Sequence, residues 1–149
     1  MKNQRGFSLI ELTVAVVFLG VLTALVAPKV SEASDYNNIL SAKRTVVTHF
    51  SYAQSSAVQR GRPVKVYIEN DSIWLAVIAT AGDSAITSKR SLAALGADVE
   101  SSLTTVTYDS RGFAVGLPLA GAKVRFHGIG VTDSVCVTRS GMVLRKGCI

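Results

Sequence analysis

The feature that most constrains this chain is a long apolar run close to its N-terminus. The run covers residues 7–27 and holds one charged side chain, the carboxylate of Glu11. At about 1.5 Å per residue, a helix over this run is roughly 31 Å long and matches the ~30 Å hydrocarbon core of a bilayer. The sequence therefore predicts a transmembrane helix over 7–27.

Basic residues flank the apolar run on both sides. Lys2 and Arg5 precede it, and Lys29 follows it. The positive-inside rule then places the N-terminus in the cytoplasm and the bulk of the chain outside it. Because an ionisable side chain within a bilayer is costly, Glu11 predicts a functional role and a partner that neutralises its charge.

Two simpler interpretations of the run are open. One is a secretory signal peptide, for which Ser31-Glu32-Ala33 could serve as the cleavage site and which would release a soluble domain. The apolar region of a signal peptide is typically only about 7–15 residues, however, and has no reason to hold a carboxylate near its start. The other interpretation, a plain single-pass anchor, leaves Glu11 and the Gly6-Phe7 junction unexplained.

The segment Gly6-Phe7-Ser8-Leu9-Ile10-Glu11-Leu12 resembles the processing site of type IV prepilins and of the pseudopilins of type II secretion. The resemblance implies that a prepilin peptidase cuts between Gly6 and Phe7, on the cytoplasmic side, and that Phe7 is then N-methylated. Glu11 becomes the fifth residue of the mature chain, where this family keeps a carboxylate. Pro28 lies where many members have a proline that kinks the helix.

The chemistry of the segment agrees with this resemblance. A carboxylate in lipid must be neutralised or paired, and cleavage creates an amine on Phe7 that can pair with Glu11 of a neighbouring subunit. Such a pair would couple extraction from the membrane to assembly of a filament. Pro28 lacks an N–H and clashes with the preceding turn, which predicts a bend or a break in the helix.

Residues 28–149 are long enough for one domain with a modest core. Apolar residues recur at helical spacing over 29–60, and Gly61 and Pro63 follow as stop signals. The predicted inner face of this helix consists of Tyr36, Ile39, Leu40, Val47, Phe50, Ala53 and Ala57.

From Val64 onward the apolar period changes to two, which is typical of strands. Residues 81–100 lack this pattern and predict a connection with a short helical piece at 92–95. The predicted strands cover residues 64–69, 73–80, 103–108, 122–127, 134–139 and 142–145. A long helix covered by one antiparallel sheet is an α+β arrangement, and it is also the pilin architecture.

Three later segments extend the resemblance to minor subunits of the GspH and FimT kind. They cover the end of the predicted helix at 52–64, the Tyr108-Asp109-Ser110-Arg111-Gly112-Phe113 stretch, and residues 137–141. The resemblance implies a structural minor pilin or pseudopilin in the inner membrane, with its C-terminal domain in the periplasm. Its implied partners are other pilin subunits and the prepilin peptidase that also methylates the N-terminus.

Cys136 and Cys148 are the only cysteines of the chain. They are either two buried thiols or a disulfide, and a location outside the cytoplasm favours the disulfide. In the chain-entropy model such a bond stabilises the domain by about 3 kcal/mol. With no nearby histidine, the pair does not predict a zinc site.

No pattern in the sequence predicts enzyme chemistry. His49 and His127 each lack a nucleophile or a metal-ligand companion at a recognisable spacing. The Gly128-Ile129-Gly130 stretch lacks the spacing of a phosphate-binding loop. We therefore expect no enzymatic activity, no catalytic residue, no cofactor and no metal.

DNA uptake is the alternative function. The net charge of +6 falls to +4 without Lys2 and Arg5, and residues 110–149 hold six basic residues against one acid. The candidate DNA contacts are Arg139, Arg145 and Lys146. DNA-capturing relatives of the FimT kind carry a Gly-Arg-x-Arg motif in this hairpin, where this chain has Gly141-Met142-Val143-Leu144. We therefore expect DNA binding that is weak at most.

Overall fold

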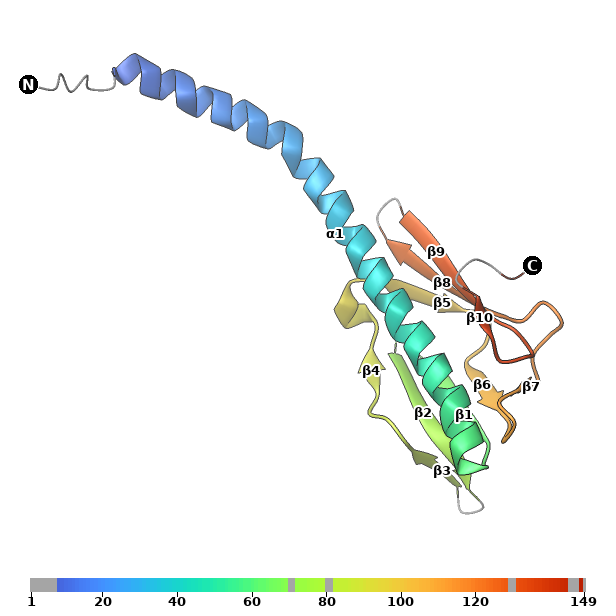
Figure 1. Cartoon of the computed structure of the whole chain (residues 1–149). Coiled ribbons are helices and arrows are strands. Elements are labelled where there is room, and N and C mark those ends of the chain that lie inside the picture. The colour runs from blue at the N-terminus through green and yellow to red at the C-terminus, as the bar shows by residue number, and fades with distance from the viewer. Residues whose placement is uncertain (1–7, 70–71, 80–81, 129–130, 145–147, 149) are drawn as a thin grey trace, which may run out of the picture. The chain divides into compact units, whose positions relative to one another are not determined.

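The structure is a computed structural model that describes residues 8–69, 72–79, 82–128, 131–144 and 148, without the side chains of 25–28, 30–32 and 79. The chain divides into two compact units, Met1–Ser34 and Asp35–Ile149. One helix, α1 (Leu9–Arg60), contributes to both units. Every other helix and strand that the structure describes belongs to the second unit (Figure 1).

Helix α1 combines the apolar run and the amphipathic stretch into one element. It continues through Pro28, so of the two effects predicted for this proline the break is wrong. A proline removes only one hydrogen bond from the ladder, and long helical stretches on both sides hold the helix together. The predicted end is confirmed, because α1 stops at Arg60 and Gly61 follows with a positive φ of 61°.

The inner face of α1 in the second unit is close to the predicted one. Ile39, Phe50, Ala53 and Ala57 are buried as expected. Tyr36 is 55% exposed, which contradicts its predicted place on this face. Tyr36 precedes Ile39, the first helix residue that belongs to the hydrophobic core. The buried α1 residues that were not predicted are Ala42, Val46 and Ser56.

The strands form two antiparallel sheets, where the sequence analysis predicted one. Sheet A has the order β3-β2-β1-β6-β7, with β4 also paired to β2. Its strands are β1 (Val64–Glu69), β2 (Ser72–Ala79), β3 (Gly82–Ala85), β4 (Arg90–Ser91), β6 (Thr105–Tyr108) and β7 (Ala114–Val115).

Sheet B has the order β10-β9-β8-β5. Its strands are β5 (Asp98–Ser101), β8 (Ala122–Gly128), β9 (Val131–Val137) and β10 (Val143–Leu144). The short 3-10 helix η1 (Ala93–Leu95) confirms the helical piece predicted at 92–95. Strands β3, β4, β5 and β7 were not predicted because they are short and mostly exposed, so they carry no clear alternation of apolar and polar residues.

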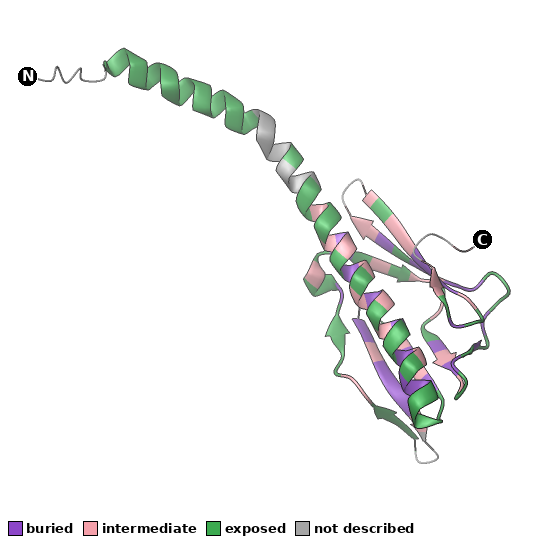
Figure 2. Ribbon diagram, in the orientation of Figure 1, coloured by how far each residue is buried: buried purple, intermediate pink, exposed green. Residues whose placement is uncertain are grey.

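One hydrophobic core joins the helix to both sheets. Figure 2 colours the buried residues purple, and they lie along the second half of α1 and along the strands of both sheets. Sheet A contributes alternate residues such as Val66 and Leu75, sheet B contributes Val124 and Phe126, and α1 contributes Phe50. The fold is therefore the predicted α+β arrangement, in which a helix packs on antiparallel strands.

Candidate assembly helix and motif junction

The first unit presents an almost wholly apolar helix surface. All of its described large apolar side chains are exposed: Leu9, Ile10, Leu12, Val14, Val16, Val17, Phe18, Leu19, Val21 and Leu22. A helix that is apolar all round needs partner helices or a non-aqueous surrounding. Among the residues described, no helix has a stretch both long and apolar enough to cross a membrane. Gly6 and Phe7 lie outside the described residues, so cleavage between them stays a prediction.

Glu11 lies in the first turn of α1, and its side chain is exposed. The helix begins after Ser8, whose carbonyl oxygen accepts hydrogen bonds from the backbone N–H groups of Glu11 and Leu12 at 3.0 and 3.2 Å. A serine followed three residues later by a glutamate is the pattern of a capping box. Two roles for Glu11 must therefore be separated by experiment, helix capping and pairing with another subunit.

A tight turn follows β6 and is organised by Asp109. Its Oδ1 accepts hydrogen bonds from the backbone N–H groups of Arg111 and Phe113, both at 2.9 Å, and its Oδ2 accepts from the Arg111 guanidinium at 3.2 Å. These donors, the N–H of Phe113 first, hold the pKa of Asp109 below its ordinary value. Gly112 completes the turn with a φ of +86°.

The lowered pKa of Asp109 gives a prediction for acid unfolding. Its ionised form stabilises the turn above the unfolded pKa of about 3.9, and this contribution is lost as the pH falls through the lower native pKa. We expect the unfolding free energy of Asp109→Asn to depend less steeply on pH below about 4 than that of the wild type. Urea unfolding across acid pH measures this, with Asp98→Asn, an exposed aspartate of β5, as the control.

The three segments that extended the resemblance meet at one place in the fold, which we call the motif junction. It consists of Gln54 on α1, Gly112 in the Asp109 turn and Gly141 in the turn between β9 and β10. Gln54 Nε2 donates a hydrogen bond to the carbonyl oxygen of Gly112 at 3.0 Å. A Cβ on Gly141 would overlap that carbonyl oxygen and lie 2.6 Å from Gln54 Nε2.

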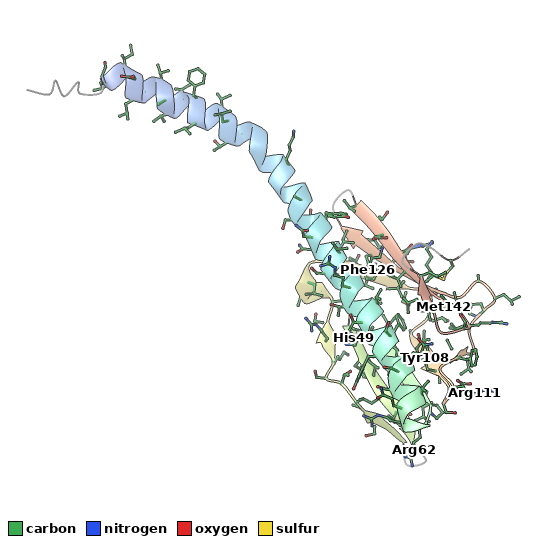
Figure 3. All side chains as sticks on the ribbon, in the orientation of Figure 1. His49, Arg62, Tyr108, Arg111, Phe126 and Met142 are labelled. Carbon is green, nitrogen blue, oxygen red and sulfur yellow. A yellow bond between two sulfur atoms is a disulfide. The ribbon has the colours of Figure 1, made fainter. Side chains whose placement is uncertain are left out.

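A backbone hydrogen bond beside the motif junction links the two sheets. The N–H of Ala114 donates to the carbonyl oxygen of Arg139 at 3.0 Å, which joins β7 of sheet A to the turn after β9 of sheet B. Figure 3 labels Arg111 and Met142, which belong to the two turns involved. The sequence motifs mark these segments one by one but do not predict that they touch, because local spacing carries no information on which distant turns meet.

Of the candidate DNA contacts, the structure describes only Arg139. Its Nε donates a hydrogen bond to the carbonyl oxygen of Leu117 at 2.9 Å, so this side chain helps to hold the loop after β7. Arg145 and Lys146 lie outside the described residues. Weak contact with DNA through these three residues therefore stays a prediction.

The two histidines make local polar contacts. His49 Nδ1 lies 2.8 Å from the carbonyl oxygen of Thr45, one helical turn earlier. His127 Nε2 lies 3.4 Å from Glu100 Oε2, and this histidine together with Arg125 holds the pKa of Glu100 below its ordinary value. In the described part of the chain, no group of three or more His, Cys, Asp or Glu residues could hold a metal ion.

Comparison with known families decides where the chain belongs. The profile of a family described as type II transport protein GspH matches residues 42–141, which include all three residues of the motif junction. The chain belongs to the GspH family. A second profile, the prokaryotic N-terminal methylation motif, matches residues 1–27. The resemblance stated from the sequence is thus confirmed at the level of the family.

One curated relative of this GspH-family chain matches over a short stretch. The type II secretion system core protein G of Pseudomonas aeruginosa is 48% identical over 42 residues, which are 28% of this chain and 30% of that protein. This chain thus spans less than a third of that relative.

Two solved structures share the fold at low sequence identity. The type IV minor pilin FimU of Pseudomonas aeruginosa has a TM-score of 0.62 and 15% identity, covering 77% of this chain and 92% of FimU. The minor pseudopilin EpsH from the type II secretion system of Vibrio cholerae has a TM-score of 0.58 and 13% identity, covering 72% and 94%. The predicted pilin-like fold is therefore confirmed.

The two cysteines of this GspH-family chain form a disulfide, as predicted. Cys136 is buried in β9, and the bond ties residue 148 to sheet B. We expect Cys148→Ser to lower the free energy of unfolding by about 2–4 kcal/mol, because the unfolded chain loses a constraint on its entropy. Chemical unfolding with and without a reductant measures this. Equal stability of the oxidised and reduced wild type would contradict the prediction.

Proposed function

We propose that this GspH-family chain is a minor structural subunit of a type II secretion pseudopilus or a type IV pilus. A prepilin peptidase cleaves it after Gly6, and Phe7 is then N-methylated. Residues 7–27 anchor the cleaved chain in the inner membrane, with its folded domain in the periplasm, until the subunit enters the filament.

The observation that carries this proposal is the exposed apolar stretch of α1 between Leu9 and Leu22, in which Glu11 is the single carboxylate. That stretch lies within the match to the N-terminal methylation motif, and a folded domain with its own core follows it. Within this chain, no described residue covers the large apolar side chains between Leu9 and Leu22, so this surface is left for lipid or for neighbouring helices to cover. The disulfide between Cys136 and Cys148 agrees with a domain outside the cytoplasm.

In this proposal Glu11 pairs with the N-terminal amine of a neighbouring subunit. A carboxylate and an amine that leave water together stabilise each other only in a close pair, while either one left alone is strongly destabilising. In the membrane, an unpaired Glu11 carboxylate is costly, whereas in the filament it is paired with an amine. The pair therefore favours entry of the helix into the filament.

Substitution of Glu11 tests the proposed function. We expect Glu11→Val to remain in the membrane fraction, because valine is favourable in lipid, while its incorporation into filaments falls by at least about tenfold. The fall follows from the amine left unpaired, since removing one partner of a buried ion pair costs about 3–5 kcal/mol. Quantitative immunoblots of membrane and sheared filament fractions measure the two effects separately.

A second variant separates pairing from helix capping. Glu11→Gln keeps a side chain that can complete the capping box but removes the charge. Failure of both variants to enter filaments supports the charge pair. If Glu11→Gln enters filaments as the wild type does, the charge pair is refuted and capping is the role of Glu11.

A further inference from the structure

A pocket of about 550 Å³ opens at the C-terminal end of α1, beside the edge of sheet A. Figure 3 labels one of its side chains, Arg62, just beyond the last turn of the helix. The lining residues are Arg60, Arg62, Val77, Ser84, Ala85 and Ile86.

The pocket exists because α1 ends before it covers the outermost strand of sheet A. Ser84 on β3 is registered with Val77 on β2, whose side chain belongs to the core. The inner face of the sheet therefore continues from Val77 to Ser84, but all four residues of β3 are exposed. The result is an open cleft with an apolar floor, formed by Val77 and Ile86, beside the two arginines.

The two arginines bring an uncompensated positive charge to this cleft. Among the described residues, no carboxylate lies within ion-pair distance of Arg60 or Arg62. The acid of β3, Asp83, bonds instead to Lys65 Nζ at 3.2 Å and to the Tyr67 hydroxyl. Its charge is therefore engaged with β1, and the cleft is complementary to an anion.

The free edge of β3 offers backbone hydrogen bonds beside the same cleft. Strand β3 is the terminal strand of sheet A. The N–H of Ile86 donates to the carbonyl oxygen of Leu75 at 2.8 Å, just beyond the ladder that joins β2 to β3. In an antiparallel ladder, residues whose backbone groups bond to the partner strand alternate with residues whose backbone groups point away from it. Because Ile86 bonds to β2, the N–H and C=O groups of Asp83 and Ala85 point to the free edge of β3. An edge with unpaired groups can accept a further strand.

We infer that the cleft and the β3 edge together bind an extended acidic segment of a neighbouring subunit. The segment adds to β3 through backbone hydrogen bonds, and an Asp or Glu side chain enters between Arg60 and Arg62. An apolar side chain two residues away on the same face of the segment contacts Ile86, which follows β3. This inference rests on the proposed function, because the segment belongs to another subunit of the filament.

The surroundings favour a peptide over a phosphate group or a nucleic acid. A phosphate would use the two guanidinium groups but neither the apolar floor nor the strand edge. An acidic strand uses all of these features at once. The peptide therefore accounts for more of the pocket than an isolated anion does.

Peptide binding to the full-length chain in detergent tests this inference. The probe is a fluorescein-labelled, amidated Val-Thr-Glu-Thr-Val peptide, in which both valines share a face with the glutamate. The control probe replaces its glutamate with glutamine. We expect the acidic probe to bind at least about tenfold more tightly than the control probe, as a charge-assisted hydrogen bond requires.

Variants of the chain test whether the acidic probe binds at the cleft and the β3 edge. The double variant Arg60→Gln and Arg62→Gln should lose the preference for the acidic probe, whereas Arg90→Gln, which changes an exposed arginine on β4, should keep it. Ala85→Pro should weaken both probes, because it removes an edge N–H while sparing the ladder to β2. Circular dichroism verifies that each variant is folded.

Equal binding of both probes to the wild type would overturn the inference, as would a preference that survives the double arginine variant. Displacement of the acidic probe by inorganic phosphate or a single-stranded oligonucleotide, at lower concentration than by unlabelled acidic peptide, would also overturn it. If the wild type enters filaments but shows no preference, only this inference fails. If it shows the preference but never enters filaments, the proposed function fails, and the assignment of the partner fails with it.

Discussion

We expect Gly6→Ala to leave nearly all of the chain uncut in the membrane, with Met1 and the rest of residues 1–6 still attached. A glycine lets a peptidase approach the backbone next to the cleaved bond, whereas alanine places a Cβ there. Without cleavage there is no free amine on Phe7 and therefore no partner for Glu11 in a neighbouring subunit. The variant should also be missing from filaments.

Intact-mass measurement of membrane-extracted protein checks this expectation. Gly20→Ala is the matched control, because a Cβ on this glycine of α1 meets nothing within 4 Å. The control should be cleaved as the wild type is and should yield a chain that begins at Phe7. A mature wild-type chain that begins at Ser34 would instead show a removable signal peptide and refute the proposed processing.

We expect Gly141→Ala to destabilise the folded domain by about 2–4 kcal/mol, the range of severe single substitutions. Two causes add together. The φ of +83° is unfavourable for alanine, and the new Cβ would overlap the carbonyl oxygen of Gly112. Relief of that overlap would pull the turn after β9 away from Gln54 and open the motif junction.

Gly116→Ala separates the two causes. Gly116 has a similar φ of +75°, but a Cβ there meets nothing within 4 Å. Gly116→Ala should therefore lower the free energy of unfolding by the backbone strain alone, about 1 kcal/mol. Urea unfolding of the two variants gives the difference. If both variants lose the same free energy of unfolding, the close approach of Gly141 to the Gly112 carbonyl oxygen does not contribute to the effect of Gly141→Ala.

The sequence by itself determined the elements that depend on local periodicity and on short motifs. The helical spacing of Ile39, Phe50, Ala53 and Ala57 correctly predicted the inner face of α1, and alternation from Val64 correctly predicted the longer strands. The N-terminal segment around Glu11 and the later turn motifs were enough to indicate the family that the profile match confirmed. All of these signals lie within a few residues of chain, where side-chain spacing and backbone geometry are directly linked.

Only the tertiary structure decided how distant segments meet. It split the strands into two sheets, joined Gln54 to Gly112 and Gly141, and left Arg60 and Arg62 beside an uncovered strand. The short strands β3 and β7 exist because longer neighbours pair with them, since neither has an apolar alternation of its own. Such pairings depend on the packing of distant segments around the shared core. Local sequence patterns do not predict which surfaces this packing brings into contact and which it leaves exposed.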